Sequence, residues 1–343
     1  MPKANWEELT RDLEELRRLA SATEHQIEEF RRLASSKLVQ EMRVAGPGGD
    51  QHLVYVHGIC KHSRGYSNGW WQALHPYTNV FGDGTLDGTR HEVLWSDLVE
   101  SSGVAPETAA LAQDGRAEWS ARVRGVLEDR AATHAFTAAP AVASLQPTRI
   151  LLSQELQPRA FLDKNVSGAF GLRVPGINCV EDFTVYMFND SVRSQIIGRF
   201  TGVVRPLLES GALVDVISHS WGTVVAYEGL RELEDAGLIQ PSVRTFFTVG
   251  AALSIFLVQL RLRPANRDGH RPDLVRRWIN LNAEGDPVGG RLKGRPFQVD
   301  EEFLHLPNLG CGLLDAACAH GSYFKLDNEE VNRDIFANFI NQS

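Results

Sequence analysis

The feature that most constrains the fold is a β-branched strand that runs straight into a tight turn and then a helix. Residues 213–217 read Leu-Val-Asp-Val-Ile, and residues 223–233 have a helical pattern of apolar positions. The turn between them, residues 218–222, reads Ser-His-Ser-Trp-Gly and has a small residue at each end. A helix that follows a buried strand directly is typical of an α/β fold, in which it crosses back over a parallel sheet.

The chain beyond residue 50 repeats this alternation of short apolar runs and helical stretches. The expected strands are residues 53–56, 92–95, 213–217, 245–249 and 277–281, while residues 183–186 fit either a strand or the start of a helix. Strands separated by helices predict a mostly parallel sheet with helices on both faces. An apolar content of 43% is sufficient for the packed core that such a sheet needs.

Two segments lie outside this minimal unit. Residues 6–40 carry apolar side chains at three- and four-residue steps, which predicts an amphipathic helix. We therefore divide the chain into an N-terminal amphipathic helical segment, 1–45, and an α/β domain, 46–343, with an Ala-rich helical cap insertion at about 103–176. The apolar stripe of the first helix has to be buried, either on its own domain or in a homodimer formed through that helix.

Composition excludes several classes of partner. The net charge of −8 argues against a nucleic-acid surface, and no run approaches the roughly 20 apolar residues of a transmembrane helix. The N-terminus lacks the apolar core of a signal peptide, which favours the cytoplasm, with secretion by a non-classical route left open.

The scattered cysteines form neither a zinc motif nor an evident disulfide framework, so we expect reduced thiols. They are Cys60, Cys179, Cys311 and Cys318.

Ser220 is the strongest candidate for a nucleophile. A serine on a tight strand-to-helix turn is lifted clear of the sheet with strained backbone angles, and it needs small neighbours such as Ser218 and Gly222 because other backbone packs against them. The positive end of the following helix lies under the serine oxygen, where negative charge develops during acyl transfer. The alternative is an ordinary helix start, capped by Ser218 or Ser220.

The end of the first strand predicts an oxyanion hole. Residues 53–56 lead into His57 and Gly58, and the next amide, that of Ile59, is free to point into a cleft. Together with the amide of Trp221, the residue after the nucleophile, it would supply two hydrogen-bond donors. His57 precedes the serine in the chain, so we interpret it as a structural residue of this loop rather than a base.

The acid and the base follow the serine. Asp286 comes shortly after the strand 277–281, and His320 lies in what we expect to be a short loop before a final helix. The chain order of serine, aspartate and histidine is typical of a triad on this kind of sheet. His305 is the alternative base, and Glu284 and Asp315 are the alternative acids.

These motifs together resemble the α/β-hydrolase superfamily, on the serine esterase and lipase side. The residues that carry the resemblance are 56–59, 182–186, 192–204, 217–228, 280–288 and 320–324. Within the superfamily, the chain is similar to a bacterial lipase-like group whose turn reads His-Ser-Leu-Gly. Trp221 replaces that leucine, which we expect to crowd the mouth of the site.

The resemblance implies an α/β-hydrolase fold and a carboxylic ester hydrolase that acts on a small-molecule or lipid ester. The reaction would pass through an acyl-enzyme and needs no cofactor or metal ion. A phospholipase, a thioesterase and an amidase share the same triad and remain alternatives. A non-catalytic partner-binding protein of this fold is the alternative from a different class.

Overall fold

The computed structural model describes residues 50–101, 110–143, 179–238, 242–264, 268–294, 296–312 and 315–342. The chain separates into two units, residues 1–49 and 50–343, and the described residues all belong to the second unit. The predicted helix over residues 6–40, and with it the dimer interface proposed there, falls outside the described residues.

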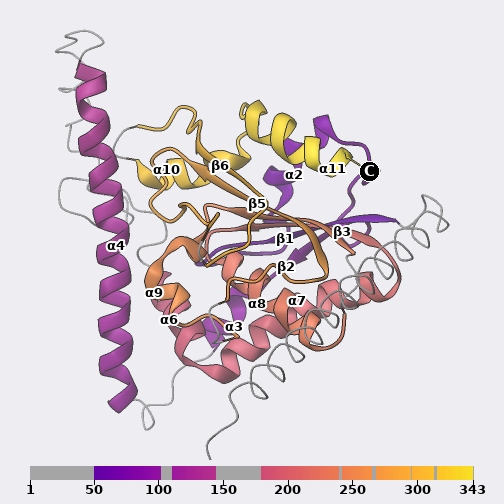
Figure 1. The fold of residues 1–343 in the computed structure, drawn as a ribbon, viewed down its shortest axis with the longest axis horizontal. Helices are drawn as coiled ribbons and strands as arrows, with labels where there is room; N and C mark the ends of the chain where they lie inside the picture. Colours follow the sequence, from indigo (N-terminus) through magenta and orange to yellow (C-terminus); the bar gives the residue numbers. More distant parts are fainter. Residues whose placement is uncertain are drawn as a thin grey trace, which may run out of the picture. The chain divides into compact units, whose positions relative to one another are not determined.

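The centre of the second unit is a six-stranded, all-parallel sheet (Figure 1). Its strands are β1 (Gln51–Val56), β2 (Arg90–Val93), β3 (Leu213–His219), β4 (Val243–Val249), β5 (Val275–Ala283) and β6 (Glu301–Leu306). They lie in the order β2-β1-β3-β4-β5-β6. The predicted α/β class with a parallel sheet is therefore confirmed, and each of the five expected strands overlaps an observed one.

Both faces of the sheet are covered. One side carries α3 (Ser96–Ser101), α7 (Asp190–Glu209) and α8 (Gly222–Asp235), and the other carries α2 (Asn68–Leu74), the π-helix η8 (Glu330–Ala337) and α11 (Asn338–Asn341) (Figure 1). Neighbouring residues of one strand serve different cores: Val216 packs toward α8, whereas Ile217 packs toward η8. Strands buried on both faces are apolar without alternation, which is why this sheet was visible in the sequence.

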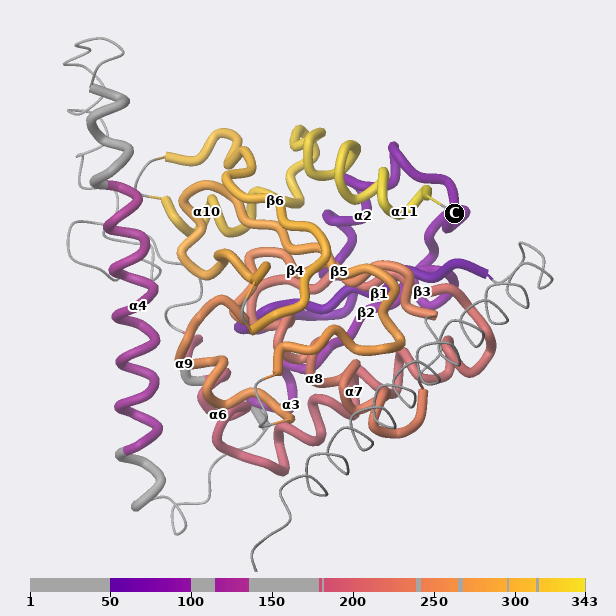
Figure 2. Tube along the Cα trace, in the orientation of Figure 1, coloured from indigo at the N-terminus to yellow at the C-terminus, as the bar shows by residue number. Residues whose placement is uncertain are grey.

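The C-terminal segment returns to the beginning of the domain. In Figure 2 the yellow end of the chain lies beside the indigo segment that contains α2 and η1 (His75–Tyr77). The hydroxyl of Thr78 donates to the side-chain oxygen of Asn341 at 2.8 Å, and the Asn341 amide donates to the carbonyl of Tyr77. These bonds join residues more than 260 positions apart and close the domain.

The structure settles the segment whose sequence fitted either a strand or a helix, and it describes part of the predicted helical cap. Residues 183–186 belong to a helix, α6 (Val180–Phe188), and not to a strand. Part of the predicted cap is a 34-residue helix, α4 (Ala110–Ala143), which packs against α6, while residues 144–178 fall outside the described part of the chain. No described helix, α4 included, is long and apolar enough to cross a membrane.

The strand order changes direction at β1. The chain passes from β1 to β2 on one side of it and then to β3 on the other side. In open parallel sheets the connections diverge at such a point and leave a crevice beyond the carboxyl ends of the two central strands, where ligands usually bind. Here those ends are followed by the loop that begins at His57 and by the turn that contains Ser220.

The expectation of four reduced cysteines is wrong for this structure. Cys60 is bonded to Cys179 and Cys311 to Cys318, with Cα–Cα distances of 5.2 and 5.5 Å. The first pair is separated by 119 positions, and only the fold brings the loop after β1 to the start of α6. Spacing alone carries no information on such a pair, because a disulfide requires nearby Cβ atoms and not a sequence motif.

Candidate active site

Ser220 occupies the sharp turn between β3 and α8. Its φ angle is +58°, a left-handed conformation that non-glycine residues adopt only when the surroundings hold them there. Both of its backbone groups are held: the Ser220 amide donates to the carbonyl of Val249 at 2.9 Å, and its carbonyl accepts the hydroxyl of Thr223 at 2.7 Å. The turn is thus built from β3, β4 and the first turn of α8, as the strand-turn-helix pattern predicted.

Two glycines allow the loop after β1 to approach this turn. A Cβ atom at Gly222 would lie 2.2 Å from the carbonyl oxygen of His57, and a Cβ atom at Gly58 would lie 2.7 Å from Cβ of Ser220. Real Cβ atoms do not come so close to other heavy atoms, so both positions require glycine. The backbone of residues 57 and 58 therefore lies directly against the predicted nucleophile.

The two predicted oxyanion donors are available. Among the described residues, neither the amide of Ile59 nor that of Trp221 has a hydrogen-bond acceptor. Ile59 follows the glycine that contacts Ser220, and Trp221 immediately precedes the 14-residue helix α8. The partial positive charge at this helix end favours an anion beside the same amides.

His57 has a structural environment. Its Nε2 atom accepts the amide of Trp95 at 3.2 Å, so the proton is on Nδ1, which donates to the carbonyl of Gly58 at 2.6 Å. The ring stacks on the indole of Trp95 at a centroid distance of 5.0 Å. Burial lowers the pKa of His57 well below its usual value, with a smaller effect from His62 nearby. Both ring nitrogens are in use, which leaves His57 no free position to act as a base.

Asp286 and His320 form a buried pair. Nδ1 of His320 lies 2.9 Å from Oδ1 of Asp286, although 34 positions separate them. Burial by itself would raise the pKa of Asp286, but the charge of His320 and the hydrogen bonds from His320, Tyr323 and Gly289 outweigh it and lower the pKa to about 2. The carboxylate is therefore ionised at neutral pH and can only accept, so the His320 proton is on Nδ1.

The other nitrogen of His320 is buried without a hydrogen-bond partner among the described residues. Its position relative to Ser220 follows from Gly250, which comes next after Val249 at the end of β4. A Cβ atom at Gly250 would lie 3.0 Å from Cε1 of His320 and 2.6 Å from Oδ2 of Asp286. Since Val249 accepts the amide of Ser220, the Asp286–His320 pair lies at the same sheet edge as the serine.

His320 differs in one respect from the prediction. It does not lie in a loop but in the last turn of a short helix, α10 (Ala316–Gly321), which Asp315 caps by accepting the amide of Cys318 at 3.0 Å. Asp315 is therefore engaged at the start of α10, and it is Asp286 that bonds to His320. Glu284 and His305 are both exposed, and neither is part of the buried pair.

Three residues of the site were missed by sequence reasoning. The hydroxyl of Tyr323 donates to Oδ2 of Asp286 at 2.6 Å. The ring of His219 lies 4.4 Å from that of His320 and its Nε2 donates to the His320 carbonyl at 2.9 Å, while burial, followed by repulsion from His320, lowers the His219 pKa to about 3. The third is Gly250. His219 directly precedes Ser220 and Tyr323 comes three positions after His320, but no pattern distinguishes such residues from ordinary core residues.

The side chain of Trp221 does not crowd the mouth of the site. It is fully buried and packs on Phe183 of α6, with ring centroids 4.0 Å apart. The part of Trp221 that belongs to the turn beside Ser220 is its backbone amide, not its side chain. A large aromatic residue is accommodated here because α6 lies over the beginning of α8 and supplies an apolar surface.

One group of side chains has the composition of a metal site. Glu234, His270 and Asp273 place one potential ligand atom each within 4.8 Å of one another. Nε of Arg231 lies 2.9 Å from Oε2 of Glu234 and already supplies a positive charge. Within the described residues this group is an ion-pair cluster, and we assign no metal to it.

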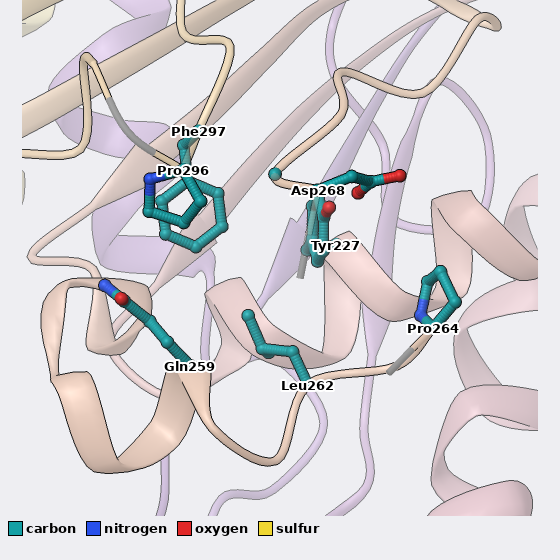
Figure 3. Close-up of a pocket in the computed structure, with 8 residues that line it drawn as sticks. Tyr227, Gln259, Leu262, Pro264, Asp268, Pro296 and Phe297 are labelled. Atoms are coloured by element: carbon teal, nitrogen blue, oxygen red, sulfur yellow. The ribbon is translucent and has the colours of Figure 1, made fainter. Parts of the chain in front are cut away.

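A small pocket is lined by a residue of α8 together with residues from 259–264, 268–269 and 296–297 (Figure 3). It has an empty volume of about 240 Å³, part of it open to solvent. Leu262, Pro264 and Phe297 make much of its lining apolar, and Tyr227 of α8 is also part of the lining. It contains none of the predicted catalytic residues, and it does not identify a substrate.

Comparison of the chain with protein-family models, with curated proteins and with solved structures finds no match. The assignment of a function therefore rests on the geometry of the site itself.

Proposed function

We propose that this protein is a serine hydrolase of the α/β-hydrolase fold that cleaves carboxylic esters. The observation that carries the proposal is the buried Asp286–His320 hydrogen bond at the sheet edge where Ser220 sits at a strained φ of +58°. The order of these residues along the chain supports the same reading.

The proposed reaction has two steps. Nε2 of His320 takes the proton from Ser220 as the serine oxygen attacks the ester carbonyl, and Asp286 stabilises the imidazolium that forms. The amides of Ile59 and Trp221 hold the oxyanion. His320 then protonates the leaving alcohol and afterwards activates the water that releases the acid.

The unpaired polar groups favour catalysis over a binding role. A buried donor or acceptor without a partner costs about 1–3 kcal/mol. In the described part of the chain, Nε2 of His320 and the amides of Ile59 and Trp221 all lack one. Other buried side-chain atoms, such as Ser67 Oγ and Trp221 Nε1, are unpaired as well, but a hydrolase would use these three groups together in its transition state.

Several finer assignments remain proposals. A phospholipase, thioesterase or amidase would use the same groups, and the acyl chain and alcohol are set by surfaces that these residues do not define. A cytoplasmic location and a homodimer through residues 6–40 also remain predictions. The two disulfides weigh against the cytoplasm, because disulfides persist mainly in oxidising compartments.

The direct test is hydrolysis of p-nitrophenyl esters from acetate to palmitate by the wild type and by Ser220→Ala. We expect turnover by the wild type and a loss of at least about 1,000-fold in kcat in Ser220→Ala, because the nucleophile is removed. Ser210→Ala is the matched control, since Ser210 is exposed at the end of α7. Absence of turnover on every ester, together with no labelling of Ser220 by a fluorophosphonate, would contradict the proposal.

A further inference from the structure

Helix α4 reaches the loop that carries Asp286. It packs through a buried stripe at four-residue steps: Trp119, Val123, Leu127, Ala131 and Ala135. Arg130 lies next to this stripe and is partly buried. One turn further on, His134 lies against the same loop, since a Cβ atom at Gly285 would be 2.9 Å from its Nε2.

Arg130 binds a set of neutral oxygens. Its Nη1 atom lies 3.1 Å from the hydroxyl of Ser254 and 3.3, 3.4 and 3.3 Å from the carbonyl oxygens of Pro287, Val288 and Gly289. Its Nη2 atom donates to the carbonyl of Ser254 at 3.2 Å. Within the described residues no carboxylate lies at hydrogen-bond distance, so the guanidinium charge is not neutralised by direct contact.

The same loop holds Asp286 from the other side. Oδ1 of Asp286 accepts the amide of Val288 at 2.9 Å and that of Gly289 at 3.2 Å. In a trans peptide the carbonyl and the N–H point in opposite directions. The peptide between Pro287 and Val288, and the one between Val288 and Gly289, therefore each present the carbonyl to Arg130 and the N–H to Asp286.

We propose that Arg130 is a positioning residue for the predicted triad: it fixes the two peptide groups that orient Asp286, and through Asp286 it orients His320. The proposal rests on the proposed function. The two peptide dipoles are aligned between a cation and an anion, which stabilises both their orientation and the carboxylate. A helix of the cap segment thereby contributes to the catalytic site without touching the substrate.

Other charged and polar groups also face Asp286. They are His320 of α10, Tyr323 of η7 (Ser322–Phe324) and His219 of β3. His320 and Tyr323 bind the carboxylate directly, so loss of Arg130 leaves Asp286 ionised and still bonded to His320. The expected defect is thus one of orientation and not of charge state.

The experiment compares Arg130→Met, Arg130→Lys and the control Arg122→Met. Arg122 lies on the same helix but is exposed and pairs with Glu118. We measure kcat and KM for p-nitrophenyl butyrate, the melting temperature, and the low-field proton resonance of the His320 Nδ1–H bond to Asp286. The resonance reports the pair directly and does not depend on turnover.

We expect kcat of Arg130→Met to fall by about 10- to 100-fold with KM changed by less than about 3-fold, because misplaced catalytic groups slow the chemical step. The His320 resonance should shift or broaden. Arg130→Lys should recover part of kcat, since an ammonium keeps the charge but cannot present a planar fork to several carbonyls. Arg122→Met should behave as the wild type.

Either of two results would overturn the inference: an Arg130→Met variant with the kcat and resonance of Arg122→Met, or a reduced kcat with an unchanged resonance. If Arg130→Met does not fold, Arg130→Lys is the variant that tests the inference. A kcat of Arg130→Lys equal to that of the wild type would then overturn the inference. These results differ from those expected if the proposed hydrolase function is wrong. If it is wrong, the wild type itself neither hydrolyses the ester nor reacts with a fluorophosphonate, while the proton resonance still reports whether Arg130 orients the Asp286–His320 pair.

Discussion

At the scale of single residues, the Asp286 carboxylate is fully satisfied although it is buried. Its oxygens accept from His320, from the Tyr323 hydroxyl and from the amides of Val288 and Gly289. Four donors compensate the desolvation of a carboxylate, which would otherwise be protonated. This compensation is why the pKa of Asp286 falls to about 2 rather than rising.

The pKa of Asp286 has a consequence for stability. A carboxyl group whose pKa is about 2 in the folded state and 3.8 in the unfolded state contributes about 2 kcal/mol above pH 4, and this contribution is lost as the pH falls toward 2. We expect Tyr323→Phe to raise the folded-state pKa of Asp286. The free energy of unfolding of the variant should therefore be lower than that of the wild type by about 1–3 kcal/mol at pH 6 and by clearly less at pH 3, as measured by urea unfolding.

Tyr66→Phe is the matched control for that experiment. The Tyr66 hydroxyl donates to the carbonyl of Tyr55 at 2.6 Å, and within the described part of the chain it has no carboxylate as a hydrogen-bond partner. Loss of the Tyr66 hydroxyl should lower the free energy of unfolding by the same amount at both pH values. An equal cost of Tyr323→Phe at pH 6 and pH 3 would show that the hydroxyl does not stabilise the charged form of Asp286.

At the scale of elements, the site depends on how closely the loop after β1 approaches the first turn of α8. Gly222 permits that approach, because its missing Cβ leaves room for the carbonyl of His57. We expect Gly222→Ala to displace this loop and the Ile59 amide with it. Loss of one oxyanion donor costs about 100- to 1,000-fold in kcat, so a fall of that order is expected in ester hydrolysis.

The control for Gly222→Ala is Gly198→Ala in α7, where an added Cβ meets no atom within 4 Å. That variant should keep the wild-type kcat, and its free energy of unfolding should rise by about 0.5–1 kcal/mol because alanine is the better helix former. If both variants keep the wild-type kcat, the loop after β1 does not supply the oxyanion donor.

The elements also show where sequence patterns were sufficient. β3 was predicted because a strand buried on both faces is a short, continuous run of apolar and β-branched residues, and α8 because its apolar positions recur at the helical period. Residues 183–186 were ambiguous because a short apolar run fits a strand as well as a buried helix, and α6 is such a helix. The tertiary contacts of α6, among them Phe183 on Trp221, decide between them.

At the scale of the whole molecule, the disulfides are the feature that sequence reasoning missed most clearly. The Cys60–Cys179 bond closes a loop of 119 residues, and the Cys311–Cys318 bond closes a loop of 7. In the chain-entropy description the longer loop restricts the unfolded chain more. We expect the free energy of unfolding to fall by about 5 kcal/mol in the double variant Cys60→Ser/Cys179→Ser and by about 2.5 kcal/mol in Cys311→Ser/Cys318→Ser.

Urea unfolding without added thiol measures both losses. Thiol labelling after denaturation provides an independent check, and we expect no free thiol in the wild type. Labelling of all four cysteines would contradict the pairing, and equal losses in the two double variants would contradict the dependence on loop length.

By itself, the sequence determined the α/β class of the fold and predicted three candidate catalytic residues. Short apolar runs and helical periodicity are local features, and the turn at Ser220 needs small residues at defined positions, so all of them can be recognised from neighbouring residues. What only the tertiary structure decided are the contacts between distant segments. They include the Asp286–His320 distance, the Tyr323 and Arg130 bonds to the acid loop, and both disulfides. Such contacts depend on strand order and helix packing, for which a single sequence carries no local signal.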